Sequence, residues 1–225
     1  KFVIMNTKKY GPWLVGLMII APLIYGAIIY PQLPSRIPTH FNIEGKADAW
    51  GGPSSIFIGP GIMGAVSIFV YILMSNLKTF DPKKYDEAND TLYSNFAVLT
   101  VAFLSLLSLI IIYSSTHADQ INVGKLILPL VGLSFAGLGW YMPKFKQNYF
   151  VGFKLPWTLE NEDNWNETHK LAGKIWMYGG FVQAVATLFL PNVAGFIVFF
   201  SITFIMVIIP TVFSYRMFKR GNTIE

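Results

Sequence analysis

The chain has 225 residues, a formal net charge of +5, and a composition that is 53% hydrophobic but only 13% charged. A soluble domain of this size would carry about 25% charged residues, so the composition excludes an ordinary soluble fold. Cysteine is absent, which excludes disulfides, thiolate metal sites and cysteine nucleophiles.

Six apolar runs are long enough to cross a bilayer, for which a helix needs about 20 residues. Backbone groups have no water to bond in lipid, so each run is predicted to be a helix. The spans are Gly11–Tyr30, Ile56–Met74, Phe96–Tyr113, Gly124–Met142, Leu171–Leu190 and Val193–Phe213. The sequence therefore predicts an all-α membrane protein with six transmembrane helices, of which the fifth is the weakest because its first turns are polar.

The six spans divide into an N-terminal membrane region, residues 1–113, and a C-terminal one, residues 114–225, with three spans each. The first run exceeds the 7–15 residues of a signal-peptide hydrophobic region, so we expect it to stay in the protein as a span. Met5 is a candidate native start.

Orientation follows from the basic residues, because Lys and Arg favour the cytoplasmic side of a membrane. With six spans, 14 basic residues lie on the side of the two termini, and three lie on the other: Arg36, Lys46 and Lys125. The sequence predicts that both termini are cytoplasmic. The same bias explains the positive net charge without a nucleic-acid partner.

The loop Pro31–Ser55 is predicted to be external and is too long to be a simple connector. Thr39–Ile43 and Ala47–Trp50 flank a short turn at Gly45, which predicts a β-hairpin. We expect four side chains of this hairpin to form one external, ligand-binding cluster in which Asp48 holds the His40 ring. They are His40, Asn42, Asp48 and Trp50.

The loop Pro143–Lys170 is predicted to be cytoplasmic, with a helix in its last third that lies in the membrane interface and continues into the fifth span. Thr158 or Asn161 is suited to cap this helix. One helical face carries Trp165, His169, Ala172 and Trp176, so His169 should point toward protein or headgroups. The alternative for Trp157, Trp165 and Trp176 is an aromatic belt at the headgroups.

The entrance to this helix is a candidate partner-binding site. Gly152 and Pro156 shape the backbone there, because glycine tolerates unusual angles and proline restricts them. Lys154, Trp157 and Thr158 would then be presented together as a charge, an aromatic anchor and a hydrogen-bonding group. The alternative is that these residues only seal the cytoplasmic end of the bundle.

A metal site is a further alternative for the external side. His40, Asp48, His117 and Asp119 have the donor atoms that zinc prefers, although no HExxH or paired-histidine spacing supports the site. No cofactor is expected. The spans hold almost no ionisable residues, which counts against an ion-coupled transporter. Gly61/Ala65, Gly132/Ala136 and Gly180/Ala184 have the spacing of close helix contacts, within one chain or between two.

The stretch from Asn148 to Trp176 resembles the signature of the SdpI family, bacterial membrane proteins that give immunity to a secreted peptide toxin. In that family an Asn, a Gly, a basic residue, a Thr-rich turn, a Trp and a His recur in this order. Here they correspond to Asn148, Gly152, Lys154, Thr158, Trp165 and His169. The family's usual basic residue is Arg, and Lys keeps the charge without the planar fork that grips phosphate or carboxylate.

The external loop is similar to a domain of unknown function that is often found ahead of the SdpI signature. Its hallmarks are matched by Pro38–Asn42, Gly45 and Asp48–Gly51. Together the resemblances imply a plasma-membrane receptor that protects a bacterium against a peptide toxin. They also imply that a cytoplasmic transcriptional repressor is a partner.

Residues and resemblance together favour a non-enzymatic immunity protein with no catalytic residues, which contacts a toxin outside, a repressor inside and lipids between. Two alternatives stay open: a membrane-embedded metal-dependent hydrolase, and a small transporter or lipid-binding protein.

Overall fold

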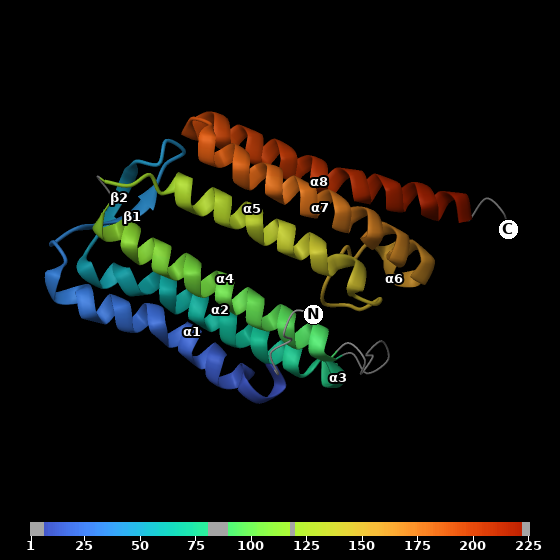
Figure 1. Cartoon of the computed structure of the whole chain (residues 1–225), viewed down its shortest axis with the longest axis horizontal. Helices are drawn as coiled ribbons and strands as arrows, with labels where there is room; N and C mark the ends of the chain where they lie inside the picture. The colour runs from blue at the N-terminus through green and yellow to red at the C-terminus, as the bar shows by residue number, and fades with distance from the viewer. Residues whose placement is uncertain (1–6, 81–89, 118–119, 222–225) are drawn as a thin grey trace. The chain divides into compact units, whose positions relative to one another are not determined.

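The computed structural model describes residues 7–80, 90–117 and 120–221. All six predicted spans are helical. The long helices are α1 (Thr7–Ile29), α2 (Ile58–Ser75), α4 (Asp90–Thr116), α5 (Gly124–Tyr141), α7 (Glu162–Phe189) and α8 (Asn192–Gly221). The short elements are η1 (Tyr30–Gln32), β1 (Ile37–Phe41), β2 (Ala47–Gly51), η2 (Pro53–Phe57), α3 (Leu77–Phe80), η4 (Met142–Lys144) and α6 (Pro156–Glu160) (Figure 1).

Five helical segments in the described part of the chain are long and apolar enough to cross a membrane: Gly11–Gln32, Pro53–Ser75, Asp90–Thr116, Gly124–Lys144 and Asn192–Arg220. The C-terminal part of α7 coincides with the predicted span Leu171–Leu190, and that sixth span stays a prediction. This stretch is less apolar than the other five because it contains Lys174 and Gln183.

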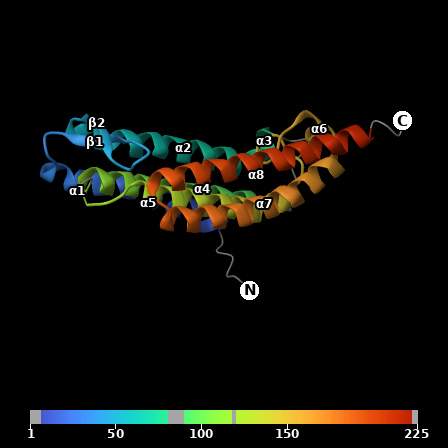
Figure 2. The same ribbon diagram turned by 90° about the horizontal axis from the view of Figure 1, so that it is seen from above.

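The chain forms two compact units, with the boundary between Ile127 and Leu128 inside α5. In unit 1, helices α1, α2 and α4 run alongside one another (Figures 1 and 2). Val15 of α1 packs against Val98 and Val101 of α4 near one end of this bundle. Near the other end, Ile37 of β1 packs with Ile56 and Ile112 and is only 1% exposed, which fastens the hairpin to the helices.

In unit 2, helix α5 approaches α7 through small residues. A Cβ added to Gly132 would lie 2.8 Å from the backbone nitrogen of Ala184, and one added to Gly180 would meet the backbone of Ala136. The Gly132/Ala136 and Gly180/Ala184 pairs therefore make a close helix contact within one chain, as small residues do in membrane proteins. Gly61 has no such neighbour within 4 Å.

Prolines inside two helices leave carbonyl groups that side chains of neighbouring helices bond. Proline has no N–H, so the carbonyl four residues earlier loses its helical donor. In unit 1, Pro22 frees the carbonyl of Met18, and the Ser105 hydroxyl of α4 donates to it at 2.6 Å. In unit 2, Pro210 frees the carbonyl of Met206, and the Trp176 indole of α7 donates to it at 2.9 Å.

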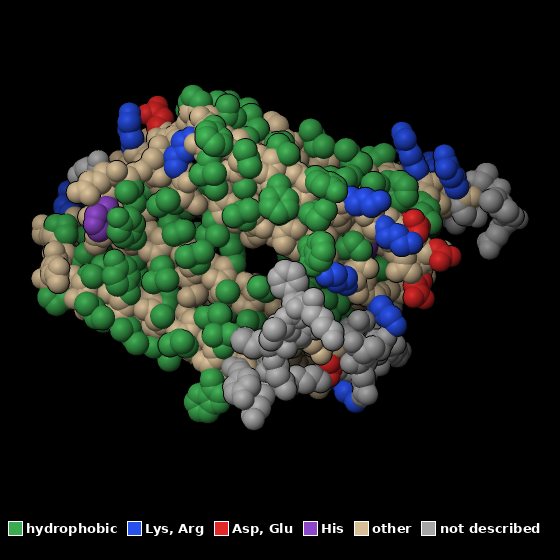
Figure 3. Space-filling view, in the orientation of Figure 1, with side chains coloured by type: hydrophobic (Ala, Val, Ile, Leu, Met, Phe, Trp, Pro, Cys, Tyr) green, Lys and Arg blue, Asp and Glu red, His purple; other side chains and the backbone are tan. Residues whose placement is uncertain are grey.

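Hydrophobic side chains cover the helices on the face drawn in Figure 3, whereas charged side chains gather at the α6 end of unit 2. Ile197, Phe200 and Phe204 of α8 are among the large apolar side chains that are at least half exposed. Such exposure suits contact with lipid rather than with water.

Candidate functional site

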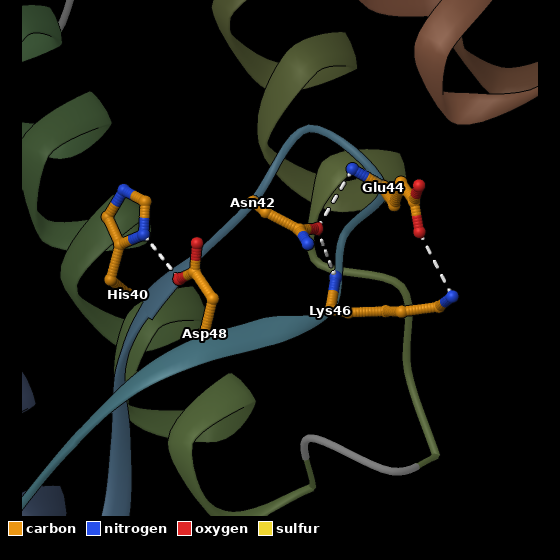
Figure 4. A network of polar contacts seen from close by, with 5 residues as sticks. All are labelled: His40, Asn42, Glu44, Lys46 and Asp48. Carbon is orange, nitrogen blue, oxygen red and sulfur yellow. Dashed lines mark hydrogen bonds and ion pairs between the residues drawn. The ribbon is translucent and has the colours of Figure 1, made fainter.

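The hairpin brings His40 and Asp48 together as predicted. Strands β1 and β2 pair antiparallel, with irregular register on both sides of His40. The His40 Nδ1 atom lies 2.5 Å from a carboxylate oxygen of Asp48 (Figure 4). The two side chains are 67% and 43% exposed, so this pair is presented on the surface of unit 1. The carboxylate orients the imidazole ring, as it does wherever Asp bonds one ring nitrogen of His.

Asn42 serves the turn of the hairpin instead of joining that pair. Its side-chain oxygen accepts from the backbone N–H groups of Glu44 and Lys46 (Figure 4). Gly45 has a φ of +77°, which glycine adopts without strain. Trp50 lies across from Pro38 in the register and is 47% exposed. The predicted four-residue cluster is therefore a surface pair, a turn residue and an exposed aromatic residue.

The proposed metal ligands do not assemble within the described residues. No group of three or more His, Cys, Asp or Glu side chains in that part of the chain is placed to hold a metal. His117 stacks on Tyr113, with ring centroids 4.2 Å apart, and its Nδ1 lies 2.8 Å from the Thr116 hydroxyl. Asp119 lies outside the described residues.

In unit 2, His169 is part of the folded interior. Its ring stacks on Trp165 at 4.0 Å, and the two side chains are 1% and 0% exposed. The predicted inward direction of His169 is confirmed. A headgroup belt is the wrong interpretation for Trp165, because the chain itself encloses that ring and its indole donates to the Phe145 carbonyl at 2.9 Å.

Hydrogen bonds fix the protonation state of His169. Its Nδ1 lies 2.7 Å from the Trp165 carbonyl, which only accepts, so Nδ1 carries the proton. Its Nε2 accepts from the Phe153 backbone N–H at 3.0 Å, so Nε2 carries none. Both nitrogens of the neutral ring are occupied. Burial accordingly lowers the pKa of His169 to about 4, although the bond to the Trp165 carbonyl acts in the opposite direction.

Gly152 allows the loop backbone to reach this ring. Its φ is +118°, and a Cβ at this position would collide with Nε2 of His169. A side chain would therefore separate the Phe153 N–H from its acceptor. Gly152 and His169 are thus both needed for one contact between the loop and α7, the hydrogen bond from the Phe153 N–H to the His169 ring.

Asn148 and Thr158 hold the rest of the loop. Asn148 is 3% exposed, and its side-chain oxygen accepts from the backbone N–H groups of Phe150 and Val151. Thr158 is fully buried; its hydroxyl lies 2.6 Å from the Phe153 carbonyl and accepts from the Leu155 N–H. These hydrogen bonds provide partners for backbone groups of the loop that do not take part in a helix or strand. Both residues are structural.

Asn161 separates α6 from α7 and is the cap that the sequence suggested. Its side-chain oxygen accepts from the backbone N–H of Asn164 at 2.8 Å. Asn164 is itself buried, and its side-chain oxygen accepts from the Ser214 hydroxyl of α8 at 2.6 Å. The Trp157 indole of α6 donates to the same hydroxyl. Sequence reasoning missed Asn164 and Ser214, because 50 residues separate them and no local pattern signals the contact.

Lys154 and Trp157 are the predicted partner residues that keep exposed surface. The Lys154 ammonium donates to the Phe150 carbonyl at 3.1 Å. The Trp157 ring is partly covered by Tyr215 and Phe218 of α8. The signature and entrance residues thus form a frame that presents the Lys154 ammonium and one edge of the Trp157 ring at its surface.

A groove of about 390 Å³ lies beside this loop within unit 2. Its walls come from the end of α5, the loop 151–155, Trp176 of α7 and two residues of α8, Val207 and Thr211. The described residues of the lining are apolar except for Thr211 and Lys154, and Lys154 is the one charged side chain among them. No sequence pattern indicates this groove, because the segments that form its walls are distant along the chain.

Two protein families and one curated protein are similar to parts of this chain. Residues 144–214 match the SdpI/YfhL protein family, and residues 17–64 match DUF1648, a domain of unknown function. The chain is 27% identical over 197 residues to a protein of Bacillus subtilis (strain 168) named Immunity protein SdpI, covering 87% of this chain and 89% of that protein. No solved structure matches the chain.

The SdpI match covers the loop, the buried Trp165–His169 stack and α8 as far as Ser214, whereas the DUF1648 match covers most of α1, the hairpin and the start of α2. The apolar helices place the chain in a membrane. The chain is therefore a multi-pass plasma-membrane protein that is similar to the SdpI family over residues 144–214 and to DUF1648 over residues 17–64.

Proposed function

We propose that this chain is a non-enzymatic immunity protein that protects a bacterial plasma membrane against a secreted peptide toxin, and that the hairpin β1–β2 contacts the toxin outside the cell. The observation that carries the proposal is the exposed His40–Asp48 pair on a hairpin fastened by the buried Ile37. The similarity to a protein named as an immunity protein supports the same function.

The hairpin has the features of a peptide-binding surface. The imidazole of His40 is oriented by Asp48, which leaves the Nε2 edge of the ring to face a ligand. The aromatic side chain of Trp50 is 47% exposed on the same hairpin. Aromatic anchors beside oriented polar groups are the usual carriers of binding energy at protein interfaces.

A protection assay tests this function. Bacteria that lack immunity express this chain and are challenged with secreted peptide toxins, including the one countered by the Bacillus subtilis relative. We expect survival that is lost in His40→Ala and Trp50→Ala and kept in Lys46→Gln, a matched change on the same hairpin. Failure of the chain to protect against any of the toxins contradicts the function. Equal protection by all variants would show that the toxin is not recognised by His40 or Trp50 of the hairpin.

We further propose that the α6–α7 junction contacts a cytoplasmic repressor. The support is the exposed Glu160, Glu162 and Asp163 beside the edge of Trp157, on a frame held by buried hydrogen bonds. Reversing the charge of Glu162 and Asp163 together should abolish membrane recruitment of the repressor and leave toxin protection intact. Unchanged recruitment in that double variant argues against the junction as the contact.

A further inference from the structure

From the groove in unit 2, we propose a binding site for an anionic phospholipid, with one acyl chain in the groove and the headgroup phosphate on Lys154. This inference goes beyond toxin immunity and does not depend on it. The groove, of about 390 Å³, has the size of a small-molecule site.

The lining fits an acyl chain. Leu138, Met142 and Phe145 form one wall, and Trp176 and Val207 contribute from α7 and α8. The Phe153 ring meets the Trp176 ring edge to face, with centroids 6.0 Å apart, so two packed aromatic rings form part of the wall. Apolar surface of this kind gains about 25 cal/mol per Å² when a hydrocarbon chain covers it.

Depth in the membrane favours a lipid over a soluble ligand. Leu138 and Met142 lie in the last turns of the apolar segment Gly124–Lys144. Lys144 and Lys146 follow at once, which marks the point where apolar sequence gives way to charged sequence. The groove therefore lies where acyl chains meet headgroups.

Charge decides which lipid binds. Among the residues that the structure describes, Lys154 is the one charged side chain that lines the groove, and no Asp or Glu lines it. Its ammonium donates to a neutral backbone carbonyl, that of Phe150. Its charge is thus free to attract a phosphate, and a net-negative headgroup is favoured over a zwitterionic one, whose own cation would meet Lys154.

Native mass spectrometry of the full chain tests the site, with phosphatidylglycerol and phosphatidylcholine of identical acyl chains as probes. We expect the first lipid to bind more tightly. Lys154→Gln should lower its affinity about fivefold, the factor expected for one basic residue near an anionic lipid. Lys174→Gln is the matched control, because Lys174 is exposed on α7 and does not line the groove.

A second variant tests the groove itself. Val207 is 40% exposed, so Val207→Trp should fold and fill the groove, lowering the affinity for both lipids. Equal binding of the two lipids by the unchanged protein overturns the proposal. Equal losses in Lys154→Gln and Lys174→Gln overturn it as well, and would leave Lys154 to a protein partner.

Discussion

At the scale of single residues, the signature of the C-terminal region describes how a loop is held rather than what it binds. His169 is neutral because one nitrogen donates to Trp165 and the other accepts from Phe153. Gly152 leaves room for that contact. A ring with both nitrogens occupied inside the protein is not available as a ligand or proton carrier. In this chain His169 therefore serves to hold the loop against α7.

The buried His169 predicts a loss of stability in acid. Its pKa is about 4 in the folded protein and 6.5 in an unfolded chain, so between these values the unfolded chain binds more protons. The free energy of unfolding therefore falls as the pH drops from 6.5 to 4, by up to about 3 kcal/mol. Denaturant unfolding in detergent at several pH values measures this slope. It should flatten in His169→Gln, and an unchanged slope in that variant contradicts the assignment.

The residues of the hairpin were predictable to the extent that local pattern determines them. Gly45 between two short strands predicted the turn, and the strand pairing then brought Asp48 to His40. Asn42 was predicted to join the cluster around His40, but its side chain bonds the turn instead. An Asn side chain beside a turn readily accepts from nearby backbone N–H groups, here those two and four residues ahead. These local hydrogen bonds hold the Asn42 side chain in the turn.

At the scale of elements, every backbone polar group of a helix in a membrane needs a hydrogen-bond partner. A proline removes one of these partners, so another group must replace it. Ser105 completes α1 at Pro22, and Trp176 completes α8 at Pro210. Each hydrogen bond supplies the donor that the carbonyl lacks within its own helix, and it also joins two helices of one unit. Sequence alone gives the prolines, whereas their partners on other helices emerge only from packing.

Removal of the Ser105 hydroxyl should destabilise unit 1. Ser105→Ala leaves the Met18 carbonyl without its donor, which we expect to cost about 1 kcal/mol, the scale of interhelical hydrogen bonds in membranes. Thr100→Ala is the matched control, because the Thr100 hydroxyl bonds the Phe96 carbonyl within α4 itself. Unfolding in a denaturing detergent series compares the two. Equal effects would show that the bond between helices carries no special weight.

The α5–α7 contact provides a second test with a control in the same helix. Gly139 faces the backbone of Met177, so Gly139→Ala should force the helices apart and destabilise unit 2 by about 1–3 kcal/mol. A Cβ added to Gly137 would meet no described atom of another segment within 4 Å, so Gly137→Ala should be neutral or slightly stabilising. The midpoint of thermal unfolding distinguishes them. A neutral result for Gly139→Ala contradicts the close packing.

At the scale of the whole molecule, hydrophobic runs predicted the positions of all six long helices, because a run of about 20 apolar residues has few alternatives to a membrane helix. Helix α7 begins at Glu162, nine residues before the predicted span, in agreement with the predicted helix that continues into that span, and Asn161, one of the two predicted candidates, caps it. The groove and the Asn164–Ser214 bond were beyond prediction, because each joins segments tens of residues apart.

Orientation is the property of the whole molecule on which the proposed function depends. Fourteen basic residues on the side of the termini, against three on the other, predict that the hairpin is outside and the α6–α7 junction inside. Single cysteines test this directly, since the chain has none of its own. Ser35 and Glu160 are suitable positions because both are exposed, whereas Thr158 is fully buried and would resist labelling on either side.

On intact cells, a membrane-impermeant maleimide should label Ser35→Cys and leave Glu160→Cys unlabelled. After the cells are opened, both should react, which shows that the second cysteine is accessible once the reagent reaches it. Labelling of Glu160→Cys on intact cells would show that the protein has the opposite orientation in the membrane. The hairpin would then face the cytoplasm, where a secreted toxin approaching from outside does not meet it, and the recognition proposal would fall with the orientation.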